Sequence, residues 1–173
     1  VKDRSLRRAI DCGAHRGEWT LAWKDRVGQI ECFEPNVEIL PFFKENTEGI
    51  QNINLYQHAL GDKPGTVAMD YETHLGTYHV TAEEGPYEIK TLDSYNFTDV
   101  DVIKIDVEGY EMEVLKGANN ALDQCTYVMI ELNNNSKKYG SNNRQITKYL
   151  IDKGFSVLIK TWPDVIFVNN YSI

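Results

Sequence analysis

The feature that most constrains the fold of this 173-residue chain is the alternation of short apolar runs with amphipathic stretches. Short apolar runs fit buried strands, and the amphipathic stretches between them fit helices that cover a sheet. This alternation is typical of βαβ units, so we predict an α/β fold, a single doubly wound domain over residues 1–173 with a mostly parallel sheet. The predicted strands cover residues 8–12, 30–33, 53–60, 102–106, 127–132, 155–159 and 165–168.

Helical spacing appears in four of the intervening stretches, at residues 18–26, 37–46, 111–116 and 145–153. Pro35 stands close to the start of the second stretch, where proline is tolerated. Gly154 directly follows the fourth, as expected of a residue that ends a helix in the left-handed conformation.

Two segments depart from the alternation. Residues 65–91 show strand-like patterning with turn residues at Gly76 and at Gly85-Pro86, so we expect a small antiparallel insert there. The last two apolar runs are joined only by residues 161–164, which is too short for a parallel crossover. We therefore predict that the last strand of the sheet is reversed.

Bulk properties exclude several classes of protein. The formal net charge is −8, which argues against an extended nucleic acid as partner. No apolar stretch approaches the roughly 20 residues of a membrane span. Cys12, Cys32 and Cys125 are odd in number and widely spaced, so we expect reduced core residues and a cytoplasmic protein.

The first predicted strand ends in a turn that suits a cofactor. Asp11 and Cys12 precede Gly13, Ala14 and His15, and Gly17 opens the following helix. Gly13 permits close approach of the backbone to a ligand, and the helix presents free N–H groups. No third glycine follows in register, so the dinucleotide fingerprint is incomplete and a nicotinamide oxidoreductase fits least.

An acidic residue ends the second predicted strand. Glu34 lies 23 positions after Asp11, where a carboxylate can accept hydrogen bonds from both hydroxyls of an adenosyl ribose. Pro35 and Asn36 follow directly and belong to the same predicted site. Ala59 and Leu60 lie near the end of the third predicted strand and are expected to wall the adenine.

With these segments in order, the sequence resembles the FkbM-type methyltransferases. The most specific match is Thr91-Leu92-Asp93-Ser94, followed by Ile103 to Glu111 and Val114 to Ala118. The resemblance covers nearly the whole chain. It implies a Rossmann-like class I methyltransferase fold and S-adenosylmethionine as methyl donor. It also implies a sugar or glycan hydroxyl, or that of a small natural product, as acceptor.

Three carboxylates are candidates for the chemistry. Asp106 and Glu131 end the fourth and fifth predicted strands, and Glu108 follows Asp106 closely. Methyl transfer needs an acceptor oxygen held in line and relieved of its proton. Asp106 is the first candidate for this role, Glu108 the second and Glu131 the third. Asp106, Glu131 and Asn133 also offer oxygen ligands for Mg²⁺, although we do not predict a metal.

The sequence is also compatible with two other functions. One is a domain that binds an adenosyl ligand without catalysis. The other is an RNA ribose 2′-O-methyltransferase, which has a related fold but uses a lysine-rich catalytic set and a basic groove.

Overall fold

The computed structural model describes residues 6–72 and 77–171, and it contains a seven-stranded central sheet of order β3-β2-β1-β7-β8-β10-β9. The chain runs outward from β1 through β2 to β3, returns to pair β7 with β1, and continues to β8. β10 runs antiparallel to both β8 and β9, which confirms the reversed last strand. The strands are β1 (Leu6–Cys12), β2 (Val27–Phe33), β3 (Ile53–Tyr56), β7 (Val100–Ile105), β8 (Tyr127–Glu131), β9 (Phe155–Thr161) and β10 (Asp164–Asn169).

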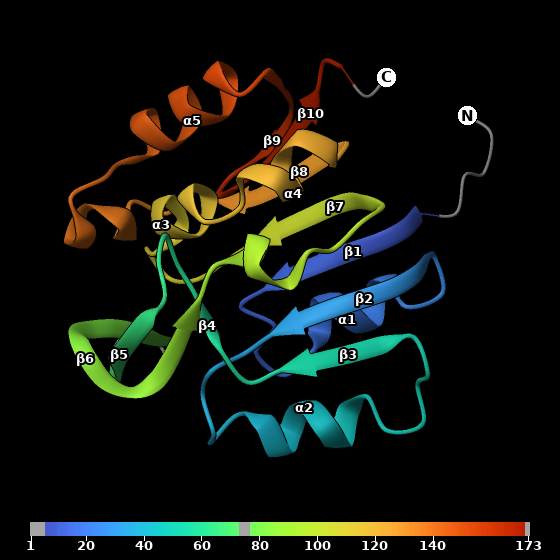
Figure 1. Ribbon diagram of the computed structural model, residues 1–173, viewed down its shortest axis with the longest axis vertical. Coiled ribbons are helices and arrows are strands. Elements are labelled where there is room, and N and C mark those ends of the chain that lie inside the picture. The colour runs from blue at the N-terminus through green and yellow to red at the C-terminus, as the bar shows by residue number, and fades with distance from the viewer. Residues whose placement is uncertain (1–5, 73–76, 172–173) are drawn as a thin grey trace.

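Helices cover both faces of this sheet (Figure 1). Side chains alternate along β1, so Ile10 joins an apolar cluster with α3, α4 and α5, while Ala9 joins a second cluster with α1 and α2. None of the helices described combines the length and apolar character needed to cross a membrane. The helices are α1 (Glu18–Trp23), α2 (Leu40–Asn46), α3 (Glu111–Lys116), α4 (Asn119–Gln124) and α5 (Asn143–Asp152).

The three cysteines are buried and free, as expected. Cys12 and Cys125 lie in the α3–α5 cluster, and Cys32 lies in the α1–α2 cluster. Gly154 has a φ of 92°, which confirms the predicted end of α5.

The insert is a second, three-stranded sheet made of β4 (Ala59–Leu60), β5 (Gly65–Glu72) and β6 (Thr77–Lys90). β5 and β6 are antiparallel, which confirms the prediction for this segment. In Figure 1 the insert stands beyond the carboxyl ends of the parallel strands, facing the edge where a doubly wound sheet binds its ligand.

Gly85 and Pro86 do not form the turn that we predicted. They lie inside β6, where the pairing shifts from Val67–Tyr87 to Ala68–Ala82. Glycine and proline interrupt the ladder there without reversing the chain, as residues at a β-bulge do. Gly76 falls outside the described residues.

The predicted strand at residues 53–60 is in fact two strands in different sheets. β3 ends at Tyr56 on the edge of the central sheet, and β4 begins at Ala59 in the insert. β4 pairs with β6 through Ala59–Ile89 and Leu60–Lys90. Both segments are apolar, so hydrophobic patterning alone cannot separate them.

Helix α4 was not predicted from the sequence. Its Asn119 and Asn120 are poor helix formers. The carboxylate of Asp93, in a 3₁₀ turn far away in the chain, accepts hydrogen bonds from the backbone N–H groups of Asn120 (3.0 Å) and Ala121 (3.1 Å). A distant side chain therefore caps this helix.

Candidate active site

A cavity of about 440 Å³ lies over the carboxyl ends of β1, β2 and β7, between them and the insert. The strand order reverses between β1 and β7, so this is the switch point where doubly wound sheets bind ligands. Its volume falls in the range of small-molecule sites. The predicted residues that line it are Gly13, Ala14, His15, Glu34, Pro35, Asn36, Ala59, Leu60, Asp106 and Glu108.

Glu34 occupies one end of the cavity and is only 6% exposed. One carboxylate oxygen accepts a hydrogen bond from the backbone N–H of His15 and the other from that of Asn36, both at 2.9 Å. Burial raises the pKa of Glu34, while these two hydrogen bonds oppose the rise. The carboxylate keeps acceptor capacity for a ligand, because two oxygens offer about four lone-pair sites.

Asn36 provides an independent sign that a polar ligand belongs at this end. Its side-chain oxygen accepts a hydrogen bond from the backbone N–H of Glu38, which fixes the amide orientation. Within the described part of the chain, the buried Nδ2 has no partner. A buried donor normally has one. Asn36 lines the cavity, so a nucleoside with ribose and ring acceptors fits this position.

Apolar groups close the cavity around Glu34. Phe33 and Ile39 line it from the β2 side, and Ala59 and Leu60 line it from β4. Met69 and Val80 contribute walls from the insert. This surface suits a flat aromatic ring such as adenine.

The turn after β1 requires glycine at position 13. Gly13 has a φ of 82°, and a Cβ atom there would lie 1.9 Å from the backbone oxygen of Asp106. The ends of β1 and β7 therefore approach each other more closely than a side chain at position 13 would permit. Gly17 caps α1 with a φ of 88° but lies outside the residues that line the cavity.

Lys104 connects the turn after β1 to Asp106, one of the candidate catalytic carboxylates. Its ammonium donates to the backbone oxygen of Gly13 (2.8 Å) and lies 3.1 Å from Asp11 and 3.4 Å from Asp106. The lysine is 7% exposed, and the charges of Asp11 and Asp106 raise its pKa despite burial. Asp11 is fully buried below the cavity, bonded also to Thr20 at 2.7 Å. Any role of Asp11 toward a cofactor is thus indirect.

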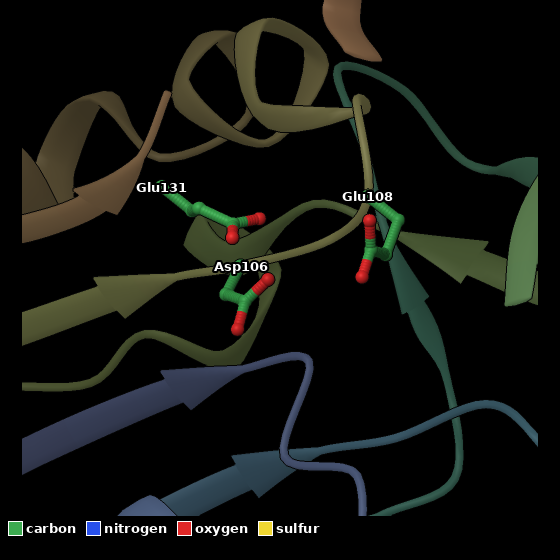
Figure 2. A group of neighbouring side chains, drawn as sticks. All are labelled: Asp106, Glu108 and Glu131. Carbon is green, nitrogen blue, oxygen red and sulfur yellow. The ribbon is translucent and has the colours of Figure 1, made fainter. Parts of the chain in front are cut away.

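The three predicted catalytic carboxylates come together (Figure 2). Asp106, Glu108 and Glu131 each offer an oxygen within 4.8 Å of the other two. Glu131 accepts a hydrogen bond from Asn133 (2.7 Å), and Glu108 accepts one from Asn135 (3.0 Å). Burial first, and then the negative charges of Asp106 and Glu108, raise the pKa of Glu131 to about 8. Burial and Asp106 raise the pKa of Glu108.

The backbone that carries Glu108 is strained. Glu108 has a φ of 53° and Gly109 a φ of 111°. A Cβ on Gly109 would come within 2.8 Å of the backbone of Asn135, so glycine is required there. Left-handed non-glycine residues persist where surrounding contacts enforce them, often at functional sites.

The three carboxylates of Asp106, Glu108 and Glu131 also have the composition of an Mg²⁺ site. Asn133 turns its Nδ2 to Glu131 and its oxygen to the backbone N–H of Asn135 at 2.9 Å. Each polar atom of the Asn133 side chain thus has one hydrogen-bond partner, its oxygen keeps a second lone pair, and Glu108 is a further oxygen donor beside Asp106 and Glu131.

Some residues of the site were not predicted from the sequence. Lys104 was readable in principle, because a lysine inside a buried apolar strand must be paired and it precedes Asp106 by two positions on the same strand face. The others offered no local signal, because long-range folding brings them to the site. They are Asn135, Met69, Val80, Tyr110 and Asp164. Glu131, though predicted, lies outside the residues lining the cavity.

Together, the strand order, the reversed β10 and the cavity at the switch point define a Rossmann-like class I methyltransferase fold. The structure of an FkbM methyltransferase from Methylobacillus flagellatus matches with a TM-score of 0.62 at 17% identity, over 95% of this chain and 44% of that chain. The model of the methyltransferase FkbM domain matches residues 11–157. The chain belongs to this family.

Two curated relatives are similar in sequence. The hexuronic acid methyltransferase AglP of Haloferax volcanii is 29% identical over 136 residues, covering 73% of this chain and 54% of that protein. The 2-O-methyltransferase NoeI of Sinorhizobium fredii is 23% identical over 128 residues, covering 60% of this chain and 53% of that protein. This chain thus spans about half the length of each relative.

Proposed function

We propose that this chain transfers the methyl group of S-adenosylmethionine to a hydroxyl oxygen of a sugar, a glycan or a small natural product. The observation that carries the proposal is the cavity that joins the Glu34 end to the Asp106–Glu108 end. One end offers acceptors and apolar walls for an adenosyl group. The other offers carboxylates for the acceptor hydroxyl and its proton.

Glu34 and Asn36 would hold the nucleoside, with Ala59 and Leu60 against the adenine and Gly13 beside the methionine portion. S-adenosylmethionine, when bound, supplies an electrophilic methyl group on a sulfonium and leaves as a neutral thioether. The chain's own task is then to place the acceptor oxygen in line with that methyl group and to receive one proton.

The surroundings divide this task between two carboxylates. Asp106 is paired with Lys104, and this ion pair holds the Asp106 carboxylate at a fixed position. There the carboxylate can accept a hydrogen bond from the acceptor hydroxyl. Glu108 lines the cavity, and its pKa is raised by burial and by the charge of Asp106, which suits it to accept a proton. In the proposed reaction the acceptor oxygen bonds to the methyl carbon, the carbon–sulfur bond breaks, and Glu108 takes the hydroxyl proton.

A sugar-like acceptor is supported by the activities of the two curated relatives, a hexuronic acid methyltransferase and a 2-O-methyltransferase. The carboxylates of Asp106, Glu108 and Asp164 at this end of the cavity do not favour an RNA strand, because its phosphate backbone is also negatively charged. This composition, with the net charge of −8, gives the RNA ribose alternative no support.

The test is a transfer assay with methyl-labelled S-adenosylmethionine and a panel of mono- and oligosaccharides, small polyols and RNA. The proposal expects label on an oxygen of a carbohydrate or small molecule and formation of S-adenosylhomocysteine. Label in RNA would favour the ribose methyltransferase. Donor binding without transfer to any acceptor would favour a non-catalytic adenosyl-binding domain.

A further inference from the structure

Lys104 is a buried cation that has no direct role in the proposed reaction. It lies on β7 opposite Asp11 of β1 in the register of the sheet, and two positions before Asp106. Its ammonium donates a hydrogen bond to the backbone oxygen of Gly13 and lies within ion-pair distance of the carboxylates of Asp11 and Asp106. An ammonium that is 7% exposed is stable in a protein only when it is paired in this way.

An ion pair with Asp11 alone would neutralise the buried charge of Lys104, because one carboxylate balances one ammonium. The fold therefore does not require the other two contacts. The other two contacts reach the cavity. The Gly13 turn borders the donor side, while the Asp106 side chain is 40% exposed at the acceptor side. Lys104 is therefore the bridge between the two halves of the site.

The charge of Lys104 also matters for the neighbouring carboxylates. Among the described residues that line the cavity, it is the sole lysine or arginine. An oxygen of Asp106 lies within 4.8 Å of oxygens of Glu108 and Glu131, so further negative charge is unfavourable at this place. The positive charge of Lys104 opposes the rise in pKa that burial causes at five groups around it, which are Asp11, Cys12, Cys32, Glu34 and Asp164.

We propose that Lys104 is a positioning residue for methyl transfer, whose ammonium fixes the Asp106 carboxylate and the Gly13 turn relative to each other. This inference rests on the proposed function. Without the ammonium, the Asp106 carboxylate loses its counter-charge and is free to turn away from its two carboxylate neighbours, and the Gly13 carbonyl loses its partner. Donor and acceptor then lose their alignment, although each is still bound.

The direct variant Lys104→Met leaves Asp11 buried and unpaired, so it is liable to unfold. The double variant Asp11→Asn with Lys104→Met removes both charges and keeps the buried volume. We expect it to fold and to bind S-adenosylhomocysteine within about fivefold of the wild-type affinity. Its turnover should fall about 10²-fold or more, because misalignment of about 1 Å has effects of this order.

Three comparisons separate positioning from a merely structural role. In the double variant, turnover should fall while the affinity for S-adenosylhomocysteine stays within about fivefold of wild type, because a positioning role affects alignment and not binding. Asp11→Asn alone, which keeps Lys104, should retain most of the turnover. Lys116→Met is the matched control, since Lys116 pairs with Glu113 at 3.2 Å on α3 and does not line the cavity.

Crystal structures of wild type and double variant provide a readout that does not depend on activity. The inference expects a displaced Asp106 carboxylate in the variant. Unchanged turnover and an unmoved Asp106 would overturn it. If wild-type protein transfers no methyl group to any acceptor, the proposed function fails, while the structural comparison still decides whether Lys104 holds Asp106.

Discussion

The carboxylate of Glu34 accepts a 2.9 Å hydrogen bond from the backbone N–H of His15, which joins the end of β2 to the turn after β1. The same carboxylate holds the N–H of Asn36 at 2.9 Å. Two neighbouring strand ends are therefore fixed around one buried acidic group, at the point where the account places the donor ribose.

Replacement of Glu34 by glutamine should weaken donor binding. Glutamine keeps the size and one acceptor oxygen but loses the charge-assisted hydrogen bonds to the ribose hydroxyls, so we expect a loss of about 2 kcal/mol. Calorimetric titration with S-adenosylhomocysteine measures the change. Glu48→Gln, at an exposed position outside the cavity, is the control. Equal affinities in Glu34→Gln and wild type would remove Glu34 from the donor site.

Glu108→Gln should lower turnover by about 10²–10⁴-fold, the usual effect of removing a general base, with donor affinity nearly unchanged. Asp106→Asn should lower turnover less, because asparagine can still accept the hydroxyl hydrogen bond. Steady-state rates and donor affinities of both variants test this order, with Glu113→Gln on α3 as control. A larger loss in Asp106→Asn would transfer the base to Asp106. A parallel loss of donor affinity would assign Asp106 to the donor's ammonium.

Protein stability should depend on the protonation of Glu131. Its pKa rises from an ordinary value of 4.5 to about 8 on folding, so the folded state retains a proton that the unfolded chain has released across this window. The free energy of unfolding must then decrease as pH rises from about 4.5 to 8. Denaturant titrations of Glu131→Gln should show a weaker decrease than wild type. Glu45→Gln, exposed on α2, should keep the wild-type slope, and an unchanged slope in Glu131→Gln would contradict the pKa shift.

Asp93→Ala should destabilise the fold through α4. The substitution leaves the N–H groups of Asn120 and Ala121 without the carboxylate that caps them, and the loss of such a cap costs about 0.5–2 kcal/mol. Urea unfolding measures this cost, and donor affinity should not change because Asp93 does not line the cavity. Wild-type stability in Asp93→Ala would show that α4 does not depend on this cap.

The strands of the central sheet and the reversed last strand could be predicted because both are marked by residues close together in the sequence. Apolar runs mark the strands, and the short connection at residues 161–164 demands the antiparallel β10. Gly13 and Glu34 could be placed for the same reason, as each ends a recognisable strand. Asp106 and Glu131 also end apolar runs, so their meeting at one sheet edge follows from parallel topology.

The features that escaped prediction depend on partners distant in the sequence. The α4 cap comes from Asp93, and β4 separates from β3 because β6 supplies its pairing partner. Asn135 reaches Glu108 across 27 positions. Lys104 falls between the two cases, since its burial was readable but its link to Gly13 required the structure.

The central claim is that this cavity holds S-adenosylmethionine, and calorimetric titration with S-adenosylhomocysteine tests it most directly, because this demethylated product binds without an acceptor. The account predicts one site per chain with a dissociation constant in the micromolar range, about −7 to −8 kcal/mol. NAD, titrated in parallel, should not bind. Absence of S-adenosylhomocysteine binding, together with binding of NAD, would contradict the account.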